Sequence, residues 1–430
     1  EWNSLVEETK SQNAKPAHKR RKSRGMEFVD LGGESKDVPR LKTGIDELDR
    51  VTGGGLVPGS AILVGGDPGI GKSTLLLQAT GELAARGLKT AYISGEESTG
   101  QVRRRAKRLN VADHPVSLAS ETSLGPILDA LMETKPDVVI IDSIQTLWTD
   151  QLGAAPGTVA QVRACSQELT RFAKKRGACV ILVGHVTKDG QLAGPRLLEH
   201  LVDTVLSFEG DEERSTRMLR ATKNRFGSTQ ELGVFEMRGD GLREISNPSE
   251  AFLSDRSGPV VGACVTATLE GSRPLLIEVQ ALLAASFGNP RRTCVGFEPA
   301  RLAMRMAVLD RHGDLCVLDQ DVFINVVGGI RLNEPASDVA AVLAIASSHL
   351  RRPLPRRLLA FGEVGLTGEL RPVPRTEKRL VEAVRLGFER VILPATPRGR
   401  RAPEVPEGLS VEVAGTVAEV MRVCFDLMSG

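Results

Sequence analysis

The sequence predicts an α/β fold with a mostly parallel sheet, followed by an α+β domain. Three short aliphatic runs are apolar on both faces of a strand, and they lie at 61–64, 138–141 and 180–183. Runs of this kind, separated by helical patterns such as 75–85, are typical of a parallel sheet buried between helices. A glycine-rich loop, 66–73, stands between the first run and this helix. Ligands of such sheets bind at the carboxyl ends of the strands, so we expect the chemistry there.

The elements around these runs follow in chain order. Residues 1–37 show no apolar periodicity and contain the basic run Lys19–Arg24, so we expect a basic, flexible N-terminal segment. Residues 38–248 are expected to form the first domain. Its second strand is predicted at 90–94, and the helix that follows carries Arg103 to Arg108.

The second domain is expected at 249–430. The alternation of strands and helices breaks near Ser246–Ser249, where turn-forming residues gather, and this break marks the boundary. Strand-like runs follow at 260–265 and 275–279, and a helix rich in alanine and leucine at 338–350. Two domains are also what a chain of 430 residues favours, because single cores stop growing below that size.

Composition excludes several classes of protein. Hydrophobic residues make up 41% of the chain and charged residues 26%, as in ordinary globular proteins. No run approaches the about 20 apolar residues that span a bilayer, and no run resembles the apolar core of a signal peptide, so we expect no membrane association and a cytoplasmic location. The 6 cysteines include no C-x-x-C pair, which argues against a disulfide framework or a structural zinc site. The chain begins at Glu1 rather than Met, so we expect a truncated or processed form.

Charge is balanced overall and clustered locally. The formal net charge of +2 says little about an anionic partner. Further basic clusters lie at Arg103–Arg105, at Arg351 and Arg352 with Arg356 and Arg357, and at Arg398 with Arg400 and Arg401. One such cluster alone is most simply a solvated face, but several together indicate a polyanionic partner. Aromatic residues are only 3% of the chain, so phosphate contacts rather than base stacking would have to dominate.

The loop after the first strand has the spacing of a phosphate-binding loop. Its pattern is G-x-x-x-x-G-K-S, between a strand and a helix. The glycines allow backbone N–H groups to converge on phosphate oxygens, and the helix N-terminus adds its dipole. Lys72 would reach the β- and γ-phosphates of ATP, and the Ser73 hydroxyl would ligate Mg²⁺. The predicted nucleotide-binding residues are Gly66, Asp67, Pro68, Gly69, Ile70, Gly71, Lys72, Ser73 and Thr74.

Two further strand ends supply candidate catalytic groups. Asp142 closes the run at 138–141 and is expected to hold Mg²⁺ through water, although a strand-terminal Asp is often only a cap or turn former. Gln145 follows it and is placed to sense the γ-phosphate. Hydrolysis also needs a carboxylate that orients the attacking water, and Glu96 and Glu97 end the second strand. Either can serve, with a slight preference for Glu97; the other would be an ion-pair partner for the Arg103 helix.

The wider pattern resembles a known family. Leu41–Gly44 and Gly53–Ser60 resemble the lead-in to the phosphate loop of RecA-like and circadian-clock-type ATPases. With Ser94–Ser98, Gly184–Gly190 and above all Lys223–Gly227, the chain resembles the bacterial RadA/Sms family of DNA repair proteins along its length. The fold implied is a RecA-type core. The opening segment, Glu1 to Glu8, resembles the stretch that follows that family's four-cysteine zinc finger, so zinc would belong only to a missing N-terminal module.

This resemblance implies a homo-hexameric ring that binds ATP between subunits, encloses single-stranded DNA and promotes branch migration of recombination intermediates beside a RecA-type recombinase. Lys223 and Arg225 would then approach the nucleotide of the adjacent subunit, where an incoming cation stabilises the charge of the transition state. The alternative is two surface cations after a strand. The loops at 148–157 and 186–195 would contact DNA, with Lys188 as the better phosphate contact and Arg196 as the weaker one.

The second half resembles the proteolytic domain of Lon. Gly328–Asp338 corresponds to the nucleophile segment of that family, and Gly362–Val373 to its next strand and turn. Cleavage by a Ser–Lys pair needs a hydroxyl nucleophile and an amine that takes its proton. The second domain is therefore expected to be Lon-protease-like.

The catalytic pair itself is missing from this alignment. Ala336 takes the serine position, with Ser337 one residue late, and Glu377 takes the lysine position, with Lys378 one residue late. A slip of one residue on a helix turns a side chain by about 100°. We expect a proteolytically inactive scaffold for ring assembly and DNA contact, in which Arg351 and Arg352 face DNA.

Three functions compete on this sequence. The leading one is a DNA-dependent ATPase that acts as a helicase-like motor in recombinational repair, in which Lys72→Ala abolishes turnover and single-stranded DNA raises it. The second is an ATP-dependent serine peptidase of Lon type, whose activity would be lost on Ser337→Ala. The third is a nucleotide-gated adaptor that recruits other recombination proteins, with ATP binding but negligible turnover.

Overall fold

The structure, a computed structural model, describes residues 39–184, 198–210, 215–253, 258 and 260–425. Within these residues, no helix combines the length and apolar character needed to cross a membrane. The strands of the described chain form a nine-stranded sheet, a seven-stranded sheet and a two-stranded ribbon.

The nine-stranded sheet is parallel over its first six positions. Its strands run in the order β3-β2-β4-β5-β1-β6-β7-β8-β9, and the pairs from β3 to β6 are all parallel, whereas β6 to β9 pair antiparallel. The strands are β1 (Ala61–Gly66), β2 (Thr90–Ser94), β3 (Ser117–Ser120), β4 (Val138–Asp142), β5 (Cys179–Val183), β6 (Thr204–Gly210), β7 (Thr216–Asn224), β8 (Leu232–Arg238) and β9 (Gly241–Glu244). The predicted α/β class, with a mostly parallel first sheet, is confirmed.

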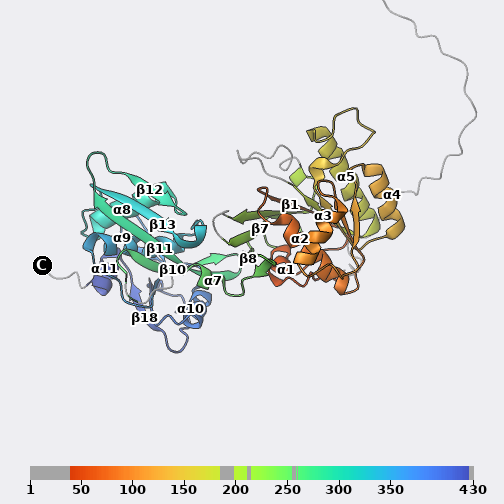
Figure 1. Ribbon diagram of the computed structural model, residues 1–430. Coiled ribbons are helices and arrows are strands. Elements are labelled where there is room, and N and C mark those ends of the chain that lie inside the picture. The colour runs from red at the N-terminus through yellow and green to blue at the C-terminus, as the bar shows by residue number, and fades with distance from the viewer. Residues whose placement is uncertain (1–38, 185–197, 211–214, 254–257, 259, 426–430) are drawn as a thin grey trace, which may run out of the picture. The chain divides into compact units, whose positions relative to one another are not determined.

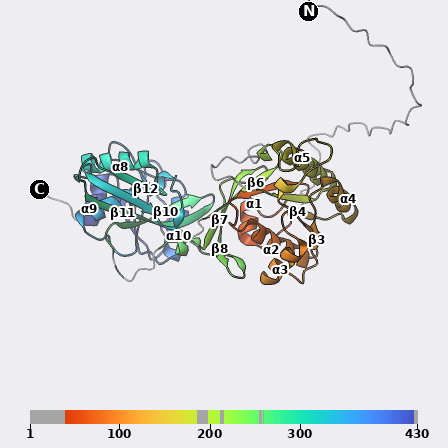
Figure 2. The same ribbon diagram turned by 45° about the horizontal axis from the view of Figure 1, so that its top comes forward.

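Helices cover both faces of the parallel part, as Figure 2 shows for α5 on one side and α2 and α3 on the other. The helices are α1 (Asp46–Thr52), α2 (Lys72–Ala85), α3 (Thr99–Arg108), α4 (Leu124–Thr134) and α5 (Val159–Arg176), with a 3₁₀ turn, η1, at Ile144–Thr146. Side chains alternate between the faces along each strand. Ile62 and Val64 of β1 pack into the core that α2 shares, and Ala61 and Leu63 pack into the core of α4 and α5. This two-sided burial explains the continuous aliphatic runs in the sequence.

The seven-stranded sheet is mixed, with order β12-β13-β11-β10-β14-β17-β18. Its strands are β10 (Ala263–Glu270), β11 (Arg273–Ala285), β12 (Arg292–Val295), β13 (Gln320–Val326), β14 (Leu358–Ala360), β17 (Arg390–Pro394) and β18 (Ser410–Ala414); β15 (Glu363–Val364) and β16 (Leu370–Arg371) form the ribbon. The helices are α7 (Pro248–Ala251), α8 (Pro299–His312), α9 (Asp338–Leu350), α10 (Thr376–Arg385) and α11 (Val417–Phe425), with 3₁₀ turns η2 (Val327–Gly329) and η3 (Pro335–Ser337) (Figure 1).

The predicted elements differ from the observed ones mainly at their ends. The strand predicted at 260–265 begins at Ala263, because Gly262 adopts φ +79° and a Cβ there would lie 2.3 Å from the carbonyl oxygen of Ala281. The helix predicted around Arg103–Arg108 begins earlier, at Thr99, where Ser98 and Gln101 form a capping box. The boundary predicted near Ser246–Ser249 lies after the last strand of the first sheet and before the first strand of the second.

Candidate active site

The phosphate-binding motif forms the turn between β1 and α2. Gly66 has φ +155°, and a Cβ there would lie 2.5 Å from the carbonyl oxygen of Phe208. Gly71 has φ +116°, and a Cβ there would lie 2.6 Å from Cε of Met237. Both positions therefore require glycine. At Gly69 a Cβ would meet nothing within 4 Å, so the tip of the turn is open on that side.

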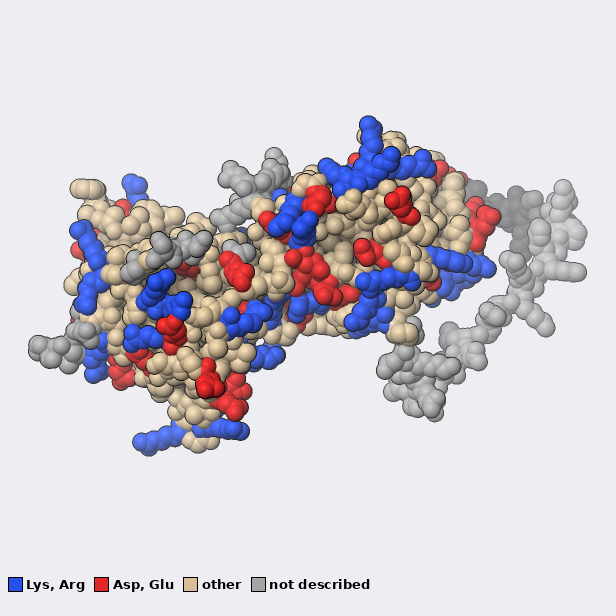
Figure 3. All heavy atoms as spheres, turned by 60° about the horizontal axis from the view of Figure 1, so that its bottom comes forward, with Lys and Arg blue, Asp and Glu red and all other residues tan. Residues whose placement is uncertain are grey.

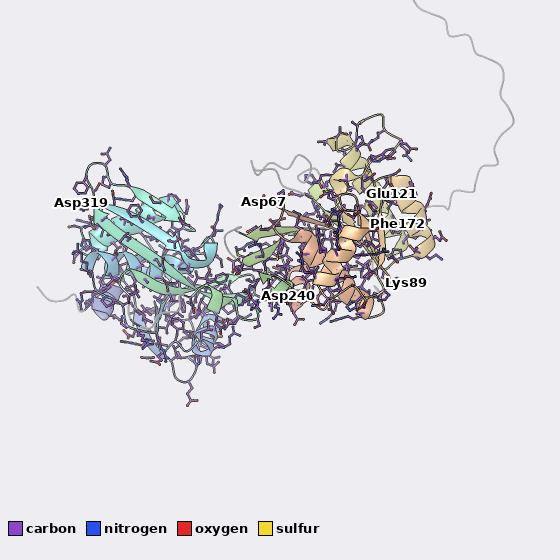
Figure 4. All side chains as sticks on the ribbon, in the orientation of Figure 1. Asp67, Lys89, Glu121, Phe172, Asp240 and Asp319 are labelled. Atoms are coloured by element: carbon purple, nitrogen blue, oxygen red, sulfur yellow. The ribbon has the colours of Figure 1, made fainter. Side chains whose placement is uncertain are left out.

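Lys72 folds back over this turn. Its Nζ donates to the carbonyl oxygens of Gly66, at 2.7 Å, and Asp67, at 2.8 Å, and the residue is 3% exposed. Figure 4 labels Asp67, which lies in this turn. Burial lowers the pKa of Lys72, and the carboxylates of Asp142, Asp67 and Glu96 oppose that shift. The ammonium group is thus held over the turn that would cradle phosphates.

A pocket of about 370 Å³ opens beside the turn. Five elements meet around it: the turn itself, the first residues of α2, the ends of β2 and β4, and the last turn of α3. Its lining consists of Pro68, Gly69, Gly71, Lys72, Ser73, Thr74, Ser94, Glu96, Glu97, Arg105, Arg108 and Asp142. The structure therefore brings together at the carboxyl ends of the strands most of the residues predicted to bind nucleotide and metal; Gly66, Asp67 and Ile70 are in the same turn.

Asp142 occupies the end of β4 and is 6% exposed. The hydroxyl of Tyr92, on the neighbouring strand β2, donates to Asp142 Oδ2 at 2.5 Å. Burial and the nearby Asp142 carboxylate raise the pKa of Tyr92 well above its ordinary value, so the phenol stays a donor at neutral pH. Tyr92 belongs to no motif that would identify it from the sequence, although its place two residues before Ser94 on a buried strand puts it on the face that leads to this pocket.

The two glutamates at the end of β2 have different partners. Glu97 accepts an ion-paired hydrogen bond from Arg105 Nη2 of α3 at 2.5 Å. Glu96 Oε1 accepts from the hydroxyl of Ser143, the residue after Asp142, at 2.5 Å. The sequence allowed either glutamate to pair with the helix that carries Arg103. In the structure Glu97 forms that ion pair, and Glu96 lies beside the end of β4, where Asp142 is.

Gln145 lies in η1, close to the end of β5. Its Oε1 is buried and has no hydrogen-bond partner within the described residues. A Cβ built on Gly184 would lie 3.6 Å from Nε2 of Gln145. The Gln145 amide therefore lies next to Gly184, the residue that follows β5. A buried acceptor without a partner is costly, so a ligand or water that donates to this amide would relieve it.

The residues of the pocket fit a Mg²⁺–ATP complex. Magnesium takes few protein ligands and keeps most of its coordination for water and phosphate oxygens. Ser73 and Asp142 supply one hydroxyl and one carboxylate on the pocket wall. In the described part of the chain, no cluster of three His, Cys, Asp or Glu side chains offers an all-protein metal cage. The pocket therefore suits a metal that arrives with its nucleotide.

Lys223 and Arg225 lie at the opposite end of the parallel strands. Arg225 Nη1 pairs with Asp203 Oδ1 at 3.1 Å, and Asp203 Oδ2 accepts from the backbone N–H of Ala61, the first residue of β1. Lys223 Nζ donates to the carbonyl oxygens of Glu199 and Val202, and its burial lowers its pKa. β1 spans about 20 Å at 3.3 Å per residue. Neither cation can therefore reach the phosphate turn of its own chain from this position.

The predicted DNA contacts are only partly within the structure. Lys188 and Arg196 lie outside the described residues. Arg351 is exposed at the end of α9. Arg352 is partly committed to the fold, because its Nη1 donates to the carbonyl oxygen of Phe425 at 2.6 Å and its guanidinium lies 5.9 Å from the Phe425 ring centroid. Figure 3 shows Lys and Arg mixed with acidic side chains over the face it presents.

The residues aligned with a Ser–Lys pair do not form one. Ala336 and Ser337 are fully buried in η3. The Ser337 hydroxyl donates to the carbonyl oxygen of Glu334 at 3.0 Å and accepts from Arg301 Nη2 at 3.1 Å. Glu377 and Lys378, in contrast, lie on α10, and both are exposed.

Two buried ion pairs lie near that position. Arg379 is fully buried, pairs with Glu334 and lies over the ring of Phe361. Arg301 pairs with Asp338 at 2.7 Å, and both are nearly or fully buried. These pairs need partners on several elements, and no spacing in the sequence predicts them.

Family comparisons agree with this architecture. The model of the AAA domain matches residues 34–191, and the model of the Lon protease (S16) C-terminal proteolytic domain matches residues 303–426. Among solved structures, one ATPase domain matches 48% of this chain and 92% of its own length, with a TM-score of 0.43 and 16% identity.

Curated relatives match almost end to end. DNA repair protein RadA of Brucella abortus (strain 2308) is 52% identical over 404 residues, which cover 92% of this chain and 86% of the relative. DNA repair protein RadA of Bacillus subtilis (strain 168) is 47% identical over 98% of this chain and 93% of its own length. That of Escherichia coli (strain K12) is 50% identical, with 91% and 85% covered. At this identity and coverage the chain, with its RecA-type core and Lon-like second half, belongs to the RadA family of DNA repair proteins.

Proposed function

We propose that this chain hydrolyses ATP to move on single-stranded DNA, as a ring of identical subunits that promotes branch migration of recombination intermediates. The observation that carries the proposal is the pocket between the phosphate turn, Glu96 and Asp142, with Arg225 held at the far end of the same strands. A subunit built in this way has one half of a catalytic site at each end of its sheet. Head-to-tail contacts between copies would join the halves, and such contacts form a ring when the rotation between copies closes.

The chemistry follows from the lining of the pocket. The N–H groups of the turn and the Lys72 ammonium would bind the β- and γ-phosphates, and Ser73 and Asp142 would hold Mg²⁺, which neutralises developing phosphate charge. Glu96 would orient the attacking water, because its partner Ser143 keeps it beside Asp142. The Nε2 amide group of Gln145 would donate to a γ-phosphate oxygen, and its buried Oε1, which has no partner within the described residues, would accept from a water.

The Lon-like half is proposed to be a scaffold without peptidase activity. A nucleophile must be exposed to substrate and close to its base. Ser337 is fully buried with its hydroxyl committed to Glu334 and Arg301, and Lys378 is exposed on another helix. This arrangement speaks against the alternative of an ATP-dependent serine peptidase. The scaffold and the exposed arginines around Arg351 would serve ring assembly and DNA contact, in a cytoplasmic protein that acts beside a RecA-type recombinase.

ATP turnover is expected to rise when single-stranded DNA is added to the purified chain. If phosphate contacts dominate, the stimulation should fall steeply as the salt concentration rises. The measurement is phosphate release across a titration with single-stranded DNA at two salt concentrations, with double-stranded DNA of the same length for comparison. A flat rate across the titration at low salt would contradict the motor, and ATP binding without turnover would favour the nucleotide-gated adaptor.

Glu96→Gln is expected to lower kcat by about 10²-fold or more, because general-base groups contribute 10² to 10⁴ in rate. The isosteric neighbour Glu97→Gln is the matched control. It weakens the ion pair to Arg105, and partly exposed pairs are worth about 1 kcal/mol or less, so the rate should fall by less than about tenfold. Both variants should still bind ATP, which equilibrium binding would check. A larger loss of kcat in Glu97→Gln would reverse the assignment.

A further inference from the structure

The two oxygens of the Asp142 carboxylate have different surroundings. Oδ2 accepts the hydrogen bond from the Tyr92 hydroxyl at 2.5 Å. Oδ1 makes no hydrogen bond within the residues that the structure describes, and Asp142 lines the pocket together with Lys72 and Ser73. One oxygen is therefore anchored to the sheet while the other is available to the pocket.

Tyr92 is held firmly enough to act as this anchor. It is 0% exposed and belongs to the hydrophobic core that also contains Leu76 and Val102. In the parallel pairing of β2 and β4, Tyr92 lies opposite Ile140 and Ser94 opposite Asp142. Residues two apart on a strand share a face, so the ring runs along the sheet toward the strand end. The packing around the ring fixes the position of its hydroxyl.

We propose that Tyr92 is a positioning residue for the metal step. It would hold Asp142 so that the second carboxylate oxygen stays turned toward the Mg²⁺ of a bound nucleotide. This inference rests on the proposed function, since it presumes a Mg²⁺–ATP complex in the pocket. Hydrogen bonds that orient a metal-binding carboxylate from behind commonly set metal affinity by 10- to 100-fold.

The neighbouring cation explains why such an anchor is needed. Lys72 and Asp142 line the same pocket. Without the phenol, the carboxylate would be free to rotate toward the Lys72 ammonium, and an ion pair there would compete with metal. Phenylalanine would fill the same space in the core, so packing alone does not require a hydroxyl that must be desolvated.

The direct test is Tyr92→Phe, with Mg²⁺ dependence as the readout. We expect the Mg²⁺ concentration that half-saturates tight binding of a fluorescent ATP analogue to rise about tenfold or more. Binding in EDTA should be unchanged. Ser60→Ala is the matched control, because it also removes a buried hydroxyl and its 2.6 Å hydrogen bond, to Val57, at the other end of β1. An unchanged Mg²⁺ requirement in Tyr92→Phe, or an equal loss of binding with and without Mg²⁺, would overturn the proposal.

Two further measurements separate this role from general support of the fold. In an Asp142→Asn background, the effect of Tyr92→Phe on Mg²⁺ dependence should disappear, because a residue that acts through Asp142 cannot act without it. An additive effect would contradict the proposal. If the wild-type protein bound the analogue equally well with and without Mg²⁺, that result would contradict the proposed metal-dependent nucleotide site itself, and not only the role of Tyr92.

The sequence also allows a test without substitution. Tyr92 is the only tyrosine among 430 residues, so growth on 3-fluorotyrosine places one fluorine label beside Asp142. We expect the single ¹⁹F resonance to shift when Mg²⁺ is added to the nucleotide complex, and not when nucleotide is added in EDTA. A resonance that ignores Mg²⁺ would refute the proposed coupling.

Discussion

Lys72→Ala should abolish ATP turnover, with a loss of about 10²-fold or more in kcat. A charged donor aimed at transferring phosphate is typically worth that much, because it acts where charge develops and needs no reorganisation. In the structure the Lys72 ammonium is already buried on the turn, held by the carbonyl oxygens of Gly66 and Asp67. A nucleotide would therefore find the cation in place. The measurement is single-turnover hydrolysis at saturating ATP, beside equilibrium binding of the same nucleotide.

Lys89→Ala is the matched control for charge. Lys89 is exposed just before β2, at the opposite end of the sheet from the turn, and Figure 4 shows Asp67 and Lys89 on opposite sides of this domain. Its loss should leave turnover nearly unchanged. Melting temperatures are needed for both variants, because Lys72→Ala removes two hydrogen bonds from the turn. Wild-type turnover in a folded Lys72→Ala protein would exclude this pocket as the site of hydrolysis.

The phosphate turn and the sheet around it could be predicted because their signals are local. A G-x-x-x-x-G-K-S spacing between a strand and a helix leaves few structures for the chain to adopt. The observed φ values at Gly66 and Gly71 agree with that requirement. The runs at 138–141 and 180–183 became buried central strands because only a sheet covered on both faces tolerates such continuous apolar residues.

The roles of Glu96, Glu97 and Tyr92 depend on contacts that sequence spacing does not encode. Which glutamate pairs with Arg105 depends on how the chain bends at 95–97 after β2 and on how α3 packs against that bend. The hydrogen bond from Tyr92 to Asp142 joins residues 50 positions apart. Its signal in the sequence is a tyrosine in the middle of a buried strand, and that residue acquires a partner only once the strand order is known.

In the Lon-like half, too, the burial of side chains and their long-range partners could not be predicted from the sequence. The alignment with Lon put Ala336 at the serine position, and it put Ser337 and Lys378 one residue after the serine and lysine positions. The structure adds that Ser337 is buried and that Lys378 is exposed. Burial of Arg379 against Glu334 is a long-range pairing in which each charge needs the other. Such a pair depends on tertiary packing, and no periodic pattern in the sequence predicts it.

The largest remaining effect is expected from Arg225→Ala, which should lower kcat by about 10³-fold or more if the guanidinium completes a neighbour's site. Its own chain offers it only Asp203 within the described residues; the Arg225 side chain is 52% exposed, whereas that of Asp203 is 5% exposed. The variant leaves a buried carboxylate without its cation, so its melting temperature must be measured beside kcat. Arg238→Ala, which removes another half-exposed arginine from an ion pair at the end of β8, is the control for loss of charge.

Mixing variants tests whether the site is shared between subunits. Lys72→Ala lacks the phosphate-binding lysine but keeps Arg225, and Arg225→Ala has the reverse defect, so each alone should be inactive. In randomly mixed rings about one quarter of the interfaces would combine an intact turn with an intact arginine, because a head-to-tail contact draws one half from each copy. ATP turnover should therefore reappear on mixing and reach about a quarter of the wild-type rate. Lys223→Ala is expected to behave like Arg225→Ala in the same mixture. If mixing restored nothing although light scattering showed mixed assemblies, Arg225 would act within its own chain or not at all, and the two ends of the sheet would not belong to one catalytic cycle.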